Sequence, residues 1–315
     1  MVVGQKRKNI KKMNKVTPQE FNERVKWNLQ QKIDHSLYII DSFLTQYPNC
    51  VISYSGGIDS TVLLYLVRII DKNRKGVFVN TTNEHLEILK FVKETSNIET
   101  IVPKITFIEV VEKYGFPLVS KNIARMLNDL KHPTKKNAKS RKRWETGLNS
   151  KGNTAHFLLS EKWKFLINQP FDVTNKCCYF LKKKPFKIYE KGGVIIGTLA
   201  TESRDRKFSY LRTGCINIAT NKCIPLAIWT KKDIWDFIKQ NNIPYCKIYD
   251  MGESSTGCAY CAFGFGFDPT RFERLKKREP KRYRIMMNLK NNEICYGEAL
   301  RIVSRKPYKG MFDEY

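Results

Sequence analysis

A β-prone run, a glycine turn and the start of an apolar helix follow one another in the sequence Cys50-Val51-Ile52-Ser53-Tyr54-Ser55-Gly56-Gly57-Ile58-Asp59-Ser60. Glycine has no Cβ atom, so the backbone of the turn can bend sharply and come close to a ligand. The first N–H groups of the following helix, together with its dipole, face the same turn and form an anion site. No Gly-Lys-Ser/Thr follows, so this is not the lysine-containing P-loop. The stretch predicts a loop that holds the phosphate chain of a nucleotide, with contacts from Ser53, Ser55, Gly56, Gly57, Asp59 and Ser60.

The acidic residue of this loop, Asp59, needs an explanation of its own. A carboxylate repels a phosphate group unless a cation lies between them, so we expect Asp59 to cap the helix or to contact a metal ion. Mg²⁺ is the candidate ion. Asp59 is therefore predicted to be a catalytic as well as a nucleotide-binding residue.

Strand-like and helix-like segments alternate along the chain. The β-prone runs are 50–54, 76–80, 99–102 and 193–198, and the helical patterns are 17–47, 60–70, 84–95 and 107–114. The alternation predicts an α/β fold with a parallel twisted sheet flanked by helices. We expect a basic flexible arm at 1–16, a nucleotide-binding domain at 17–250 with a mobile basic loop at 131–153, and a Cys-rich C-terminal subdomain with a basic helical region at 251–315.

The 315 residues include 57 Lys and Arg against 30 Asp and Glu, which gives a formal net charge of +27. Such an excess favours polyanionic partners, with nucleic acid first. The basic residues concentrate at 6–15, 131–143 and 274–284, although runs of this kind also occur as solvated surface. No segment approaches the roughly 18 apolar residues of a membrane span, and the N-terminus lacks a secretory signal. We expect a cytoplasmic protein without membrane contact.

Nine cysteines are present, and an odd number in a cytoplasmic chain argues against a disulfide framework. Two pairs stand out, the adjacent Cys177-Cys178 and the Cys-x-x-Cys pair Cys258 and Cys261. Four thiolates hold either a zinc ion or an iron–sulfur cluster, and adjacent cysteines are less usual for structural zinc. The alternative, buried free thiols, is the expectation for the remaining cysteines: Cys50, Cys223 and Cys246, with Cys295 structural and Cys215 a candidate reactive thiol.

The six residues Ser55–Ser60 resemble the PP-loop signature of ATP pyrophosphatases and sulfonucleotide reductases. Similarity to the phosphoadenosine phosphosulfate (PAPS) reductase family continues through residues 80–84, 113–121 and 197–206. The resemblance implies a sheet like that of the adenine nucleotide alpha hydrolases. It also implies nucleotide contacts from Asn80, Thr82, Gly197, Glu202 and Arg204.

Arg204 and Arg206 suit an anion clamp, because guanidinium groups match phosphate and sulfate oxygens bidentately. They are predicted catalytic residues, and ion pairs with Glu202 or Asp205 are the alternative. The Cys-Cys pair with a distant Cys-x-x-Cys resembles the [4Fe–4S] pattern of adenylylsulfate (APS) reductases. That resemblance implies a cluster held by Cys177, Cys178, Cys258 and Cys261, with zinc as the alternative.

Members of the family that this chain resembles catalyse different reactions. Sulfonucleotide reductases use a cysteine in a C-terminal Glu-Cys-Gly-type tail, whereas residues 309–315 here contain none. Family members of the DNA phosphorothioation type hydrolyse ATP to AMP and pyrophosphate. Our leading hypothesis is an ATP pyrophosphatase of sulfur metabolism that activates a nucleic acid for sulfur incorporation, with a sulfur-donor protein such as a cysteine desulfurase. The alternatives are an APS or PAPS reductase and a non-catalytic nucleic-acid-binding module.

Overall fold

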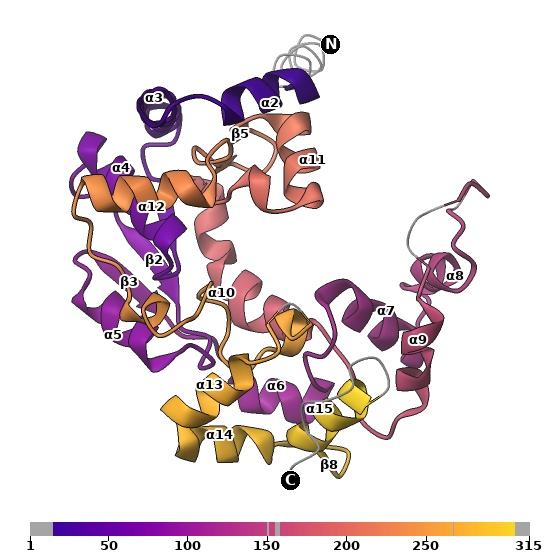
Figure 1. Cartoon of the computed structure of the whole chain (residues 1–315). Helices are drawn as coiled ribbons and strands as arrows, with labels where there is room; N and C mark the ends of the chain where they lie inside the picture. Colours follow the sequence, from indigo (N-terminus) through magenta and orange to yellow (C-terminus); the bar gives the residue numbers. More distant parts are fainter. Residues whose placement is uncertain (1–14, 150, 155–157, 267, 306–315) are drawn as a thin grey trace. The chain divides into compact units, whose positions relative to one another are not determined.

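The computed structural model describes residues 15–149, 151–154, 158–266 and 268–305 (Figure 1). Residues 1–14 of the expected basic arm lie outside the described residues. The chain forms two compact units, each assembled from separate segments. The first unit comprises the described residues of Met1–Asn80, Glu84–Val102 and Pro185–Thr256, and the second those of Thr81–Asn83, Pro103–Lys184 and Gly257–Tyr315.

A six-stranded sheet forms the centre of the first unit, in the order β3-β2-β1-β4-β6-β5. Its strands are β1 (Val51–Tyr54), β2 (Gly76–Val79), β3 (Ile98–Ile101), β4 (Val194–Ile196), β5 (Ile216–Asn217) and β6 (Lys222–Cys223). All neighbours are parallel except β5, which runs antiparallel to β6. The predicted α/β fold with a parallel sheet is confirmed.

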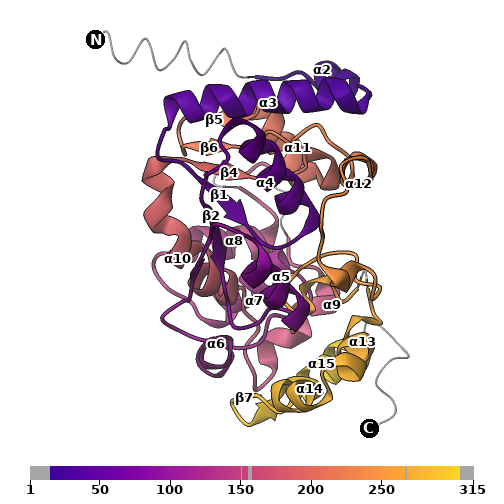
Figure 2. The same cartoon turned by 90° about the vertical axis from the view of Figure 1, so that its left-hand side faces the viewer.

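Helices cover this sheet, and α3 and α4 lie over one face of it (Figure 2). The helices of the first unit are α2 (Pro18–Val25), α3 (Leu29–Gln46), α4 (Ile58–Ile70), α5 (Leu86–Glu94), α11 (Arg204–Thr213) and α12 (Lys231–Gln240). The helical pattern at 17–47 is a pair of helices because Asn28 begins a new one. Its side chain accepts a hydrogen bond from the Gln31 N–H, and the Gln31 side-chain oxygen accepts one from the Asn28 N–H.

A buried polar row joins α3 to the start of α12. The Lys32 ammonium is only 2% exposed and donates to the Asp233 carboxylate over 2.7 Å. One turn later, the Ser36 hydroxyl accepts from the Trp229 indole over 2.9 Å and donates to the Pro225 carbonyl. Towards its C-terminus, α3 instead buries the apolar residues Ile40, Phe43 and Leu44. Paired polar groups therefore fix the position at which α12 begins.

The second unit is mainly helical and has a core of its own. Its helices are α6 (Phe107–Tyr114), α7 (Lys121–Lys131), α8 (Ala138–Thr146), α9 (Glu161–Lys164), α13 (Arg271–Arg278), α14 (Pro280–Met287) and α15 (Tyr296–Arg305), with a hairpin of β7 (Lys290–Asn291) and β8 (Ile294–Cys295). Phe116 stacks on Tyr296, with ring centroids 5.0 Å apart, and both rings are fully buried. Gly115 ends α6 at φ +98°, where a side chain would collide with the Asp172 carbonyl.

The basic segment at 131–153 differs from the expected mobile loop. Residues Ala138–Thr146 form helix α8, which ends at Gly147 in the left-handed conformation. Lys and Arg are good helix formers, and Trp144 anchors the helix because its ring is buried in the second core. The prediction failed because the density of charge masked one buried aromatic residue and a C-terminal glycine.

The expected boundary near residue 250 lies close to Thr256–Gly257, where the chain passes from the first unit to the second. Residues 103–184, which we expected in the nucleotide-binding domain, pack with the C-terminal segment. Among the described residues, no helix combines the length and the apolar character that crossing a bilayer requires.

The Lys32–Asp233 pair generates a prediction for stability. Burial alone would raise the pKa of Asp233, but hydrogen bonds from Lys32 and Thr230 outweigh it and lower the pKa. The contribution of this pair is therefore fully present above the ordinary aspartate pKa and is lost as pH falls through the lower folded pKa. We expect Lys32→Met to reduce the free energy of unfolding by about 3 kcal/mol at neutral pH, and by less below about pH 4.

Urea unfolding followed by circular dichroism measures this difference at each pH. Lys90→Met is the control, because Lys90 pairs with Glu94 at the surface and its side chain is 80% exposed. Removing such a pair costs about 0–1 kcal/mol. Equal losses for the two variants at neutral pH, or a Lys32→Met loss that persists in acid, would contradict the assignment.

Candidate functional site

The predicted phosphate loop, Ser55–Ser60, lies where the strand order of the sheet reverses. β1 leads into α4 and then to β2 on one side, whereas β4 is its neighbour on the other side. In open α/β sheets, ligands bind at this switch point beyond the carboxyl ends of the strands. Gly57 precedes α4 without providing a side-chain cap. The helix N-terminus therefore presents its N–H groups and dipole at the site.

Hydrogen bonds within the loop fix its shape. Gly56 adopts φ +73°, which favours glycine. The Ser60 hydroxyl donates to the Gly57 carbonyl over 2.9 Å and accepts from the Ser55 N–H over 3.2 Å. The Ser55 and Ser60 hydroxyl oxygens are 3.0 Å apart. The two hydroxyls that we expected to face the ligand therefore also hold the turn together.

Two other segments of the first unit close tightly on the loop. The Ile58 N–H donates to the Tyr249 hydroxyl over 3.0 Å. Gly197 follows β4, and a Cβ atom there would lie 2.9 Å from the Asp59 carbonyl oxygen and 3.2 Å from the Ser60 nitrogen. The predicted loop residue Gly197 is thus in place beside the loop, while Tyr249 was missed because nothing local in the sequence marks it.

A cluster of four charged side chains accompanies the loop. The Lys231 ammonium lies 2.8 and 2.6 Å from the two carboxylate oxygens of Asp59. It also lies 2.9 Å from a Glu202 oxygen, and the other Glu202 oxygen pairs with Arg206. The cluster is neutral overall, and its Asp59 and Glu202 carboxylates are about three-quarters buried. Asp59, for which we expected a capping role or a metal contact, is instead paired with the Lys231 ammonium.

The remaining predicted nucleotide contacts are distributed over both units. Ser53 lies within β1, and Asn80 lies just after β2, where its N–H donates to the Ile101 carbonyl. Thr82 belongs to the second unit and has the unusual φ of +65° for a threonine. Its hydroxyl accepts from the Phe107 N–H at the start of α6 over 2.9 Å. Arg204 is exposed in the first turn of α11, and its role as an anion clamp stays a prediction.

All four cysteines of the expected metal set, Cys177, Cys178, Cys258 and Cys261, belong to the second unit. Asn83 positions the Cys-x-x-Cys turn, because its carbonyl accepts from the Ala259 N–H over 2.6 Å and its side chain accepts from the Tyr260 N–H over 2.9 Å. The Arg271 guanidinium donates to the Cys258 carbonyl over 3.0 Å. The sequence placed Asn83 in a nucleotide-contacting turn and gave no sign of this supporting role.

The thiols of this set influence one another electrostatically. A hydrogen bond with Cys178, burial, and then the charges of the other three thiols raise the pKa of Cys177 well above its ordinary value. The same hydrogen bond and three lysines, Lys121, Lys182 and Lys183, hold the pKa of Cys178 below its ordinary value. The four thiols therefore lie near enough to influence one another, while burial raises the pKa of Cys261 to about 12 and favours its neutral form.

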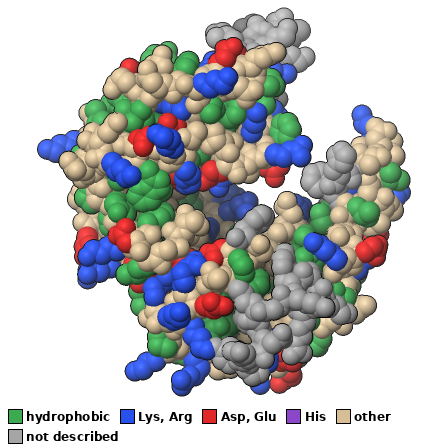
Figure 3. All heavy atoms as spheres, in the orientation of Figure 1, with side chains coloured by type: hydrophobic (Ala, Val, Ile, Leu, Met, Phe, Trp, Pro, Cys, Tyr) green, Lys and Arg blue, Asp and Glu red, His purple; other side chains and the backbone are tan. Residues whose placement is uncertain are grey.

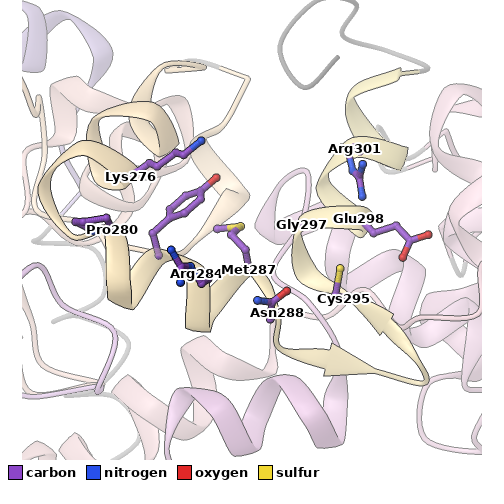
Figure 4. Close-up of a pocket in the computed structure, with 10 residues that line it drawn as sticks. Lys276, Pro280, Arg284, Met287, Asn288, Cys295, Gly297, Glu298 and Arg301 are labelled. Carbon is purple, nitrogen blue, oxygen red and sulfur yellow. The ribbon is translucent and has the colours of Figure 1, made fainter. Parts of the chain in front are cut away.

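The other cysteines divide into two kinds. Cys50, Cys223 and Cys246 are buried, as expected. Cys215 is also buried beside His35, and burial raises its pKa to about 12, which disfavours the reactive thiolate. Cys295, which we expected to be structural, is half-buried and lines a cavity of about 420 Å³ with Arg284 and Arg301 (Figure 4).

The chain is similar to known proteins of one family. Residues 49–263 match the model of the phosphoadenosine phosphosulfate reductase domain. The adenosine 5'-phosphosulfate reductase of Oceanobacillus iheyensis is 34% identical over 91 residues, which cover 28% of this chain and 37% of that protein. The first relatives are thus matched over little more than a third of their length. The reductase of the same name from Bacillus cereus is 22% identical over 251 residues, covering 77% of this chain and 86% of that protein.

A solved structure with a similar course of the chain is the phosphoadenylyl-sulfate reductase of Candida auris in complex with phosphate. It has a TM-score of 0.42 and 13% identity, and the match covers 77% of this chain and 96% of that chain.

The tight contact of Gly197 with the loop generates a prediction for binding. We expect Gly197→Ala to displace the Asp59–Ser60 backbone and to weaken adenine-nucleotide binding by about tenfold or more, which is about 1.4 kcal/mol. Isothermal titration with ATP and with APS measures the affinity. Gly297→Ala is the matched control, because its nearest neighbour would be at an ordinary 3.5 Å. Unchanged affinity in a Gly197→Ala variant with a normal circular dichroism spectrum would show that the loop is not the binding site.

Proposed function

Because the chain belongs to the phosphoadenosine phosphosulfate reductase domain family, we propose that it is a sulfonucleotide reductase. It binds APS or PAPS at the phosphate loop and releases sulfite. The observation that carries this proposal is that one family domain, residues 49–263, spans the loop and all four cysteines of the metal set. Relatives matched over part or most of their length are named as APS reductases.

The reaction needs a thiolate that is accessible to a substrate. We assign this role to Cys295, since it is half-buried in an open cavity with two arginines, whereas Cys215 is enclosed and has a raised pKa. The thiolate attacks the sulfate sulfur, the bond from sulfur to the bridging oxygen breaks, and the adenine nucleotide leaves. The product is a cysteine thiosulfonate. A dithiol reductant then attacks the cysteine sulfur, which releases sulfite and forms a disulfide.

The nucleotide leaves with an additional negative charge on its phosphate. The N-terminus of α4 and the guanidinium groups of Arg204 and Arg206 are the groups in the first unit that would stabilise that charge. Arg206 is held by Glu202, so its orientation is already restricted before a ligand binds.

The four-cysteine set fits a [4Fe–4S] cluster, and zinc is the alternative. Its thiols influence one another electrostatically, three lysines act on Cys178, and the Thr81 hydroxyl lies 4.0 Å from the Cys258 sulfur. When bound, a cluster supplies an iron centre whose potential depends on hydrogen bonds to its sulfurs and on its exposure to solvent. Cys177, Cys178, Cys258 and Cys261 would hold it.

Two cysteine variants separate the metal set from the reacting thiol. We expect Cys258→Ser to lose iron, and Cys295→Ser to keep iron but to lose sulfite production from APS or PAPS with a dithiol reductant. Cys215→Ala should retain both. Anaerobic purification, iron and zinc analysis, an absorption spectrum and a sulfite assay are the measurements. A zinc-loaded, colourless protein would overturn the cluster. Sulfite production that survives Cys295→Ser would overturn the assignment of the thiol.

A second candidate, the ATP pyrophosphatase that acts on nucleic acid with a sulfur-donor protein, is favoured by the net charge of +27. On the face in Figure 3, however, Lys and Arg side chains are spread widely and do not form one patch. Some of these side chains also form ion pairs within the chain, such as Arg274 with Asp268 and Arg282 with Glu279. Pyrophosphate release from ATP, stimulated by nucleic acid and without sulfite formation from APS or PAPS, would favour this candidate. Salt-sensitive nucleic-acid binding without turnover would indicate a non-catalytic module.

A further inference from the structure

Two carboxylates beside an anion-binding loop create an electrostatic problem. Asp59 is the second residue of α4, and Glu202 ends the short helix Ala200–Glu202 that follows β4. Their charges oppose a phosphate group at the same helix N-terminus. Proteins that hold nucleotide phosphates near carboxylates commonly place Mg²⁺ between them, since carboxylate oxygens are preferred Mg²⁺ ligands.

The Lys231 ammonium occupies the position between these carboxylates. It contacts three of their oxygens at 2.6, 2.8 and 2.9 Å, two from Asp59 and one from Glu202. Thr230 caps α12 and exchanges hydrogen bonds with Asp233, so the helix that carries Lys231 begins at a fixed place. Asp233 is in turn held by the buried Lys32. The ammonium is therefore positioned by the fold.

We propose that Lys231 is a built-in counter-cation that takes the place of a divalent metal ion between Asp59 and Glu202. The chain then binds its adenine nucleotide without Mg²⁺, because the protein itself supplies the positive charge. This inference rests on the proposed function only for the assignment of an adenine nucleotide to the loop. Lys231 affects nucleotide binding by neutralising the Asp59 and Glu202 carboxylates and does not contact the nucleotide itself, so it is a positioning residue.

The first test needs no nucleotide. Carboxylate oxygens suit Mn²⁺ as well as Mg²⁺, and Mn²⁺ binding is measured by electron paramagnetic resonance. We expect no bound Mn²⁺ at this site in the unaltered chain, because Lys231 fills it. Lys231→Met should create one Mn²⁺ site, and adding Asp59→Asn should remove that site again. Lys232→Met is the matched control, because Lys232 follows on the same helix, is 83% exposed and pairs with Asp236.

The second test measures the affinity for ATP and APS by isothermal titration, in EDTA and in millimolar Mg²⁺. The unaltered chain and Lys232→Met should bind equally well in both. Lys231→Met should lose about 100-fold in EDTA, the scale of one unit charge near a phosphate at an effective dielectric constant of about 20, and recover in Mg²⁺. The double variant with Asp59→Asn should recover without Mg²⁺, which a direct contact from Lys231 to the nucleotide would not allow.

The outcomes separate this inference from the proposed function. If Mn²⁺ binds as stated and no sulfite forms from APS or PAPS, the reductase proposal fails and the role of Lys231 stands. A Mn²⁺ site in the unaltered chain that Asp59→Asn removes, or none in Lys231→Met, overturns the inference. Nucleotide binding by the unaltered chain that requires Mg²⁺ overturns it as well.

Discussion

An uncapped helix N-terminus at the edge of a parallel sheet is the constraint around which the first unit is built. Gly57 provides no side-chain cap to α4, and although the Ile58 N–H donates to the Tyr249 hydroxyl, the helix dipole still points at an anion bound there. Side chains beside the loop must therefore be small, and negative charges beside it must be neutralised. Glycine follows β4 at position 197, where a side chain would meet the loop backbone, and Lys231 offsets the charges of the Asp59 and Glu202 carboxylates.

Local sequence patterns were enough to predict strands β1 to β4 and the helices that follow β1 and β2, whereas the two-residue strands β5 and β6 and helices α11 and α12 were not predicted. The run 51–54, the glycine turn and the helix after it are one continuous signal, and the predicted helix Phe107–Tyr114 has its ends where the capping residues Thr106 and Gly115 place them. The segment 138–146 was predicted wrongly for a physical reason. Charge density indicated a solvated loop, whereas helix formation needed only Trp144 to reach the core.

The site itself could be predicted only where its residues are neighbours in sequence. Lys231 lies 172 positions from Asp59, and Asn83 lies 177 positions from Tyr260, so no local pattern reveals either contact. The four cysteines of the metal set were predicted from their spacing together with the resemblance to the APS reductase pattern. Which cysteine is accessible could not be predicted, because the difference between Cys215 and Cys295 is one of burial.

Whether the cation at the loop is Lys231 or a divalent metal ion affects which nucleotide the loop can bind. A triphosphate carries more charge than a phosphosulfate and is usually bound together with a divalent ion, which must find carboxylates that are free to coordinate it. Here the two carboxylates at the loop are already shared by Lys231 and Arg206. A single lysine charge matches a ligand with fewer charges at this position. If Lys231 replaces a divalent ion, as we propose, the loop would suit a sulfonucleotide better than ATP, on grounds independent of the four cysteines.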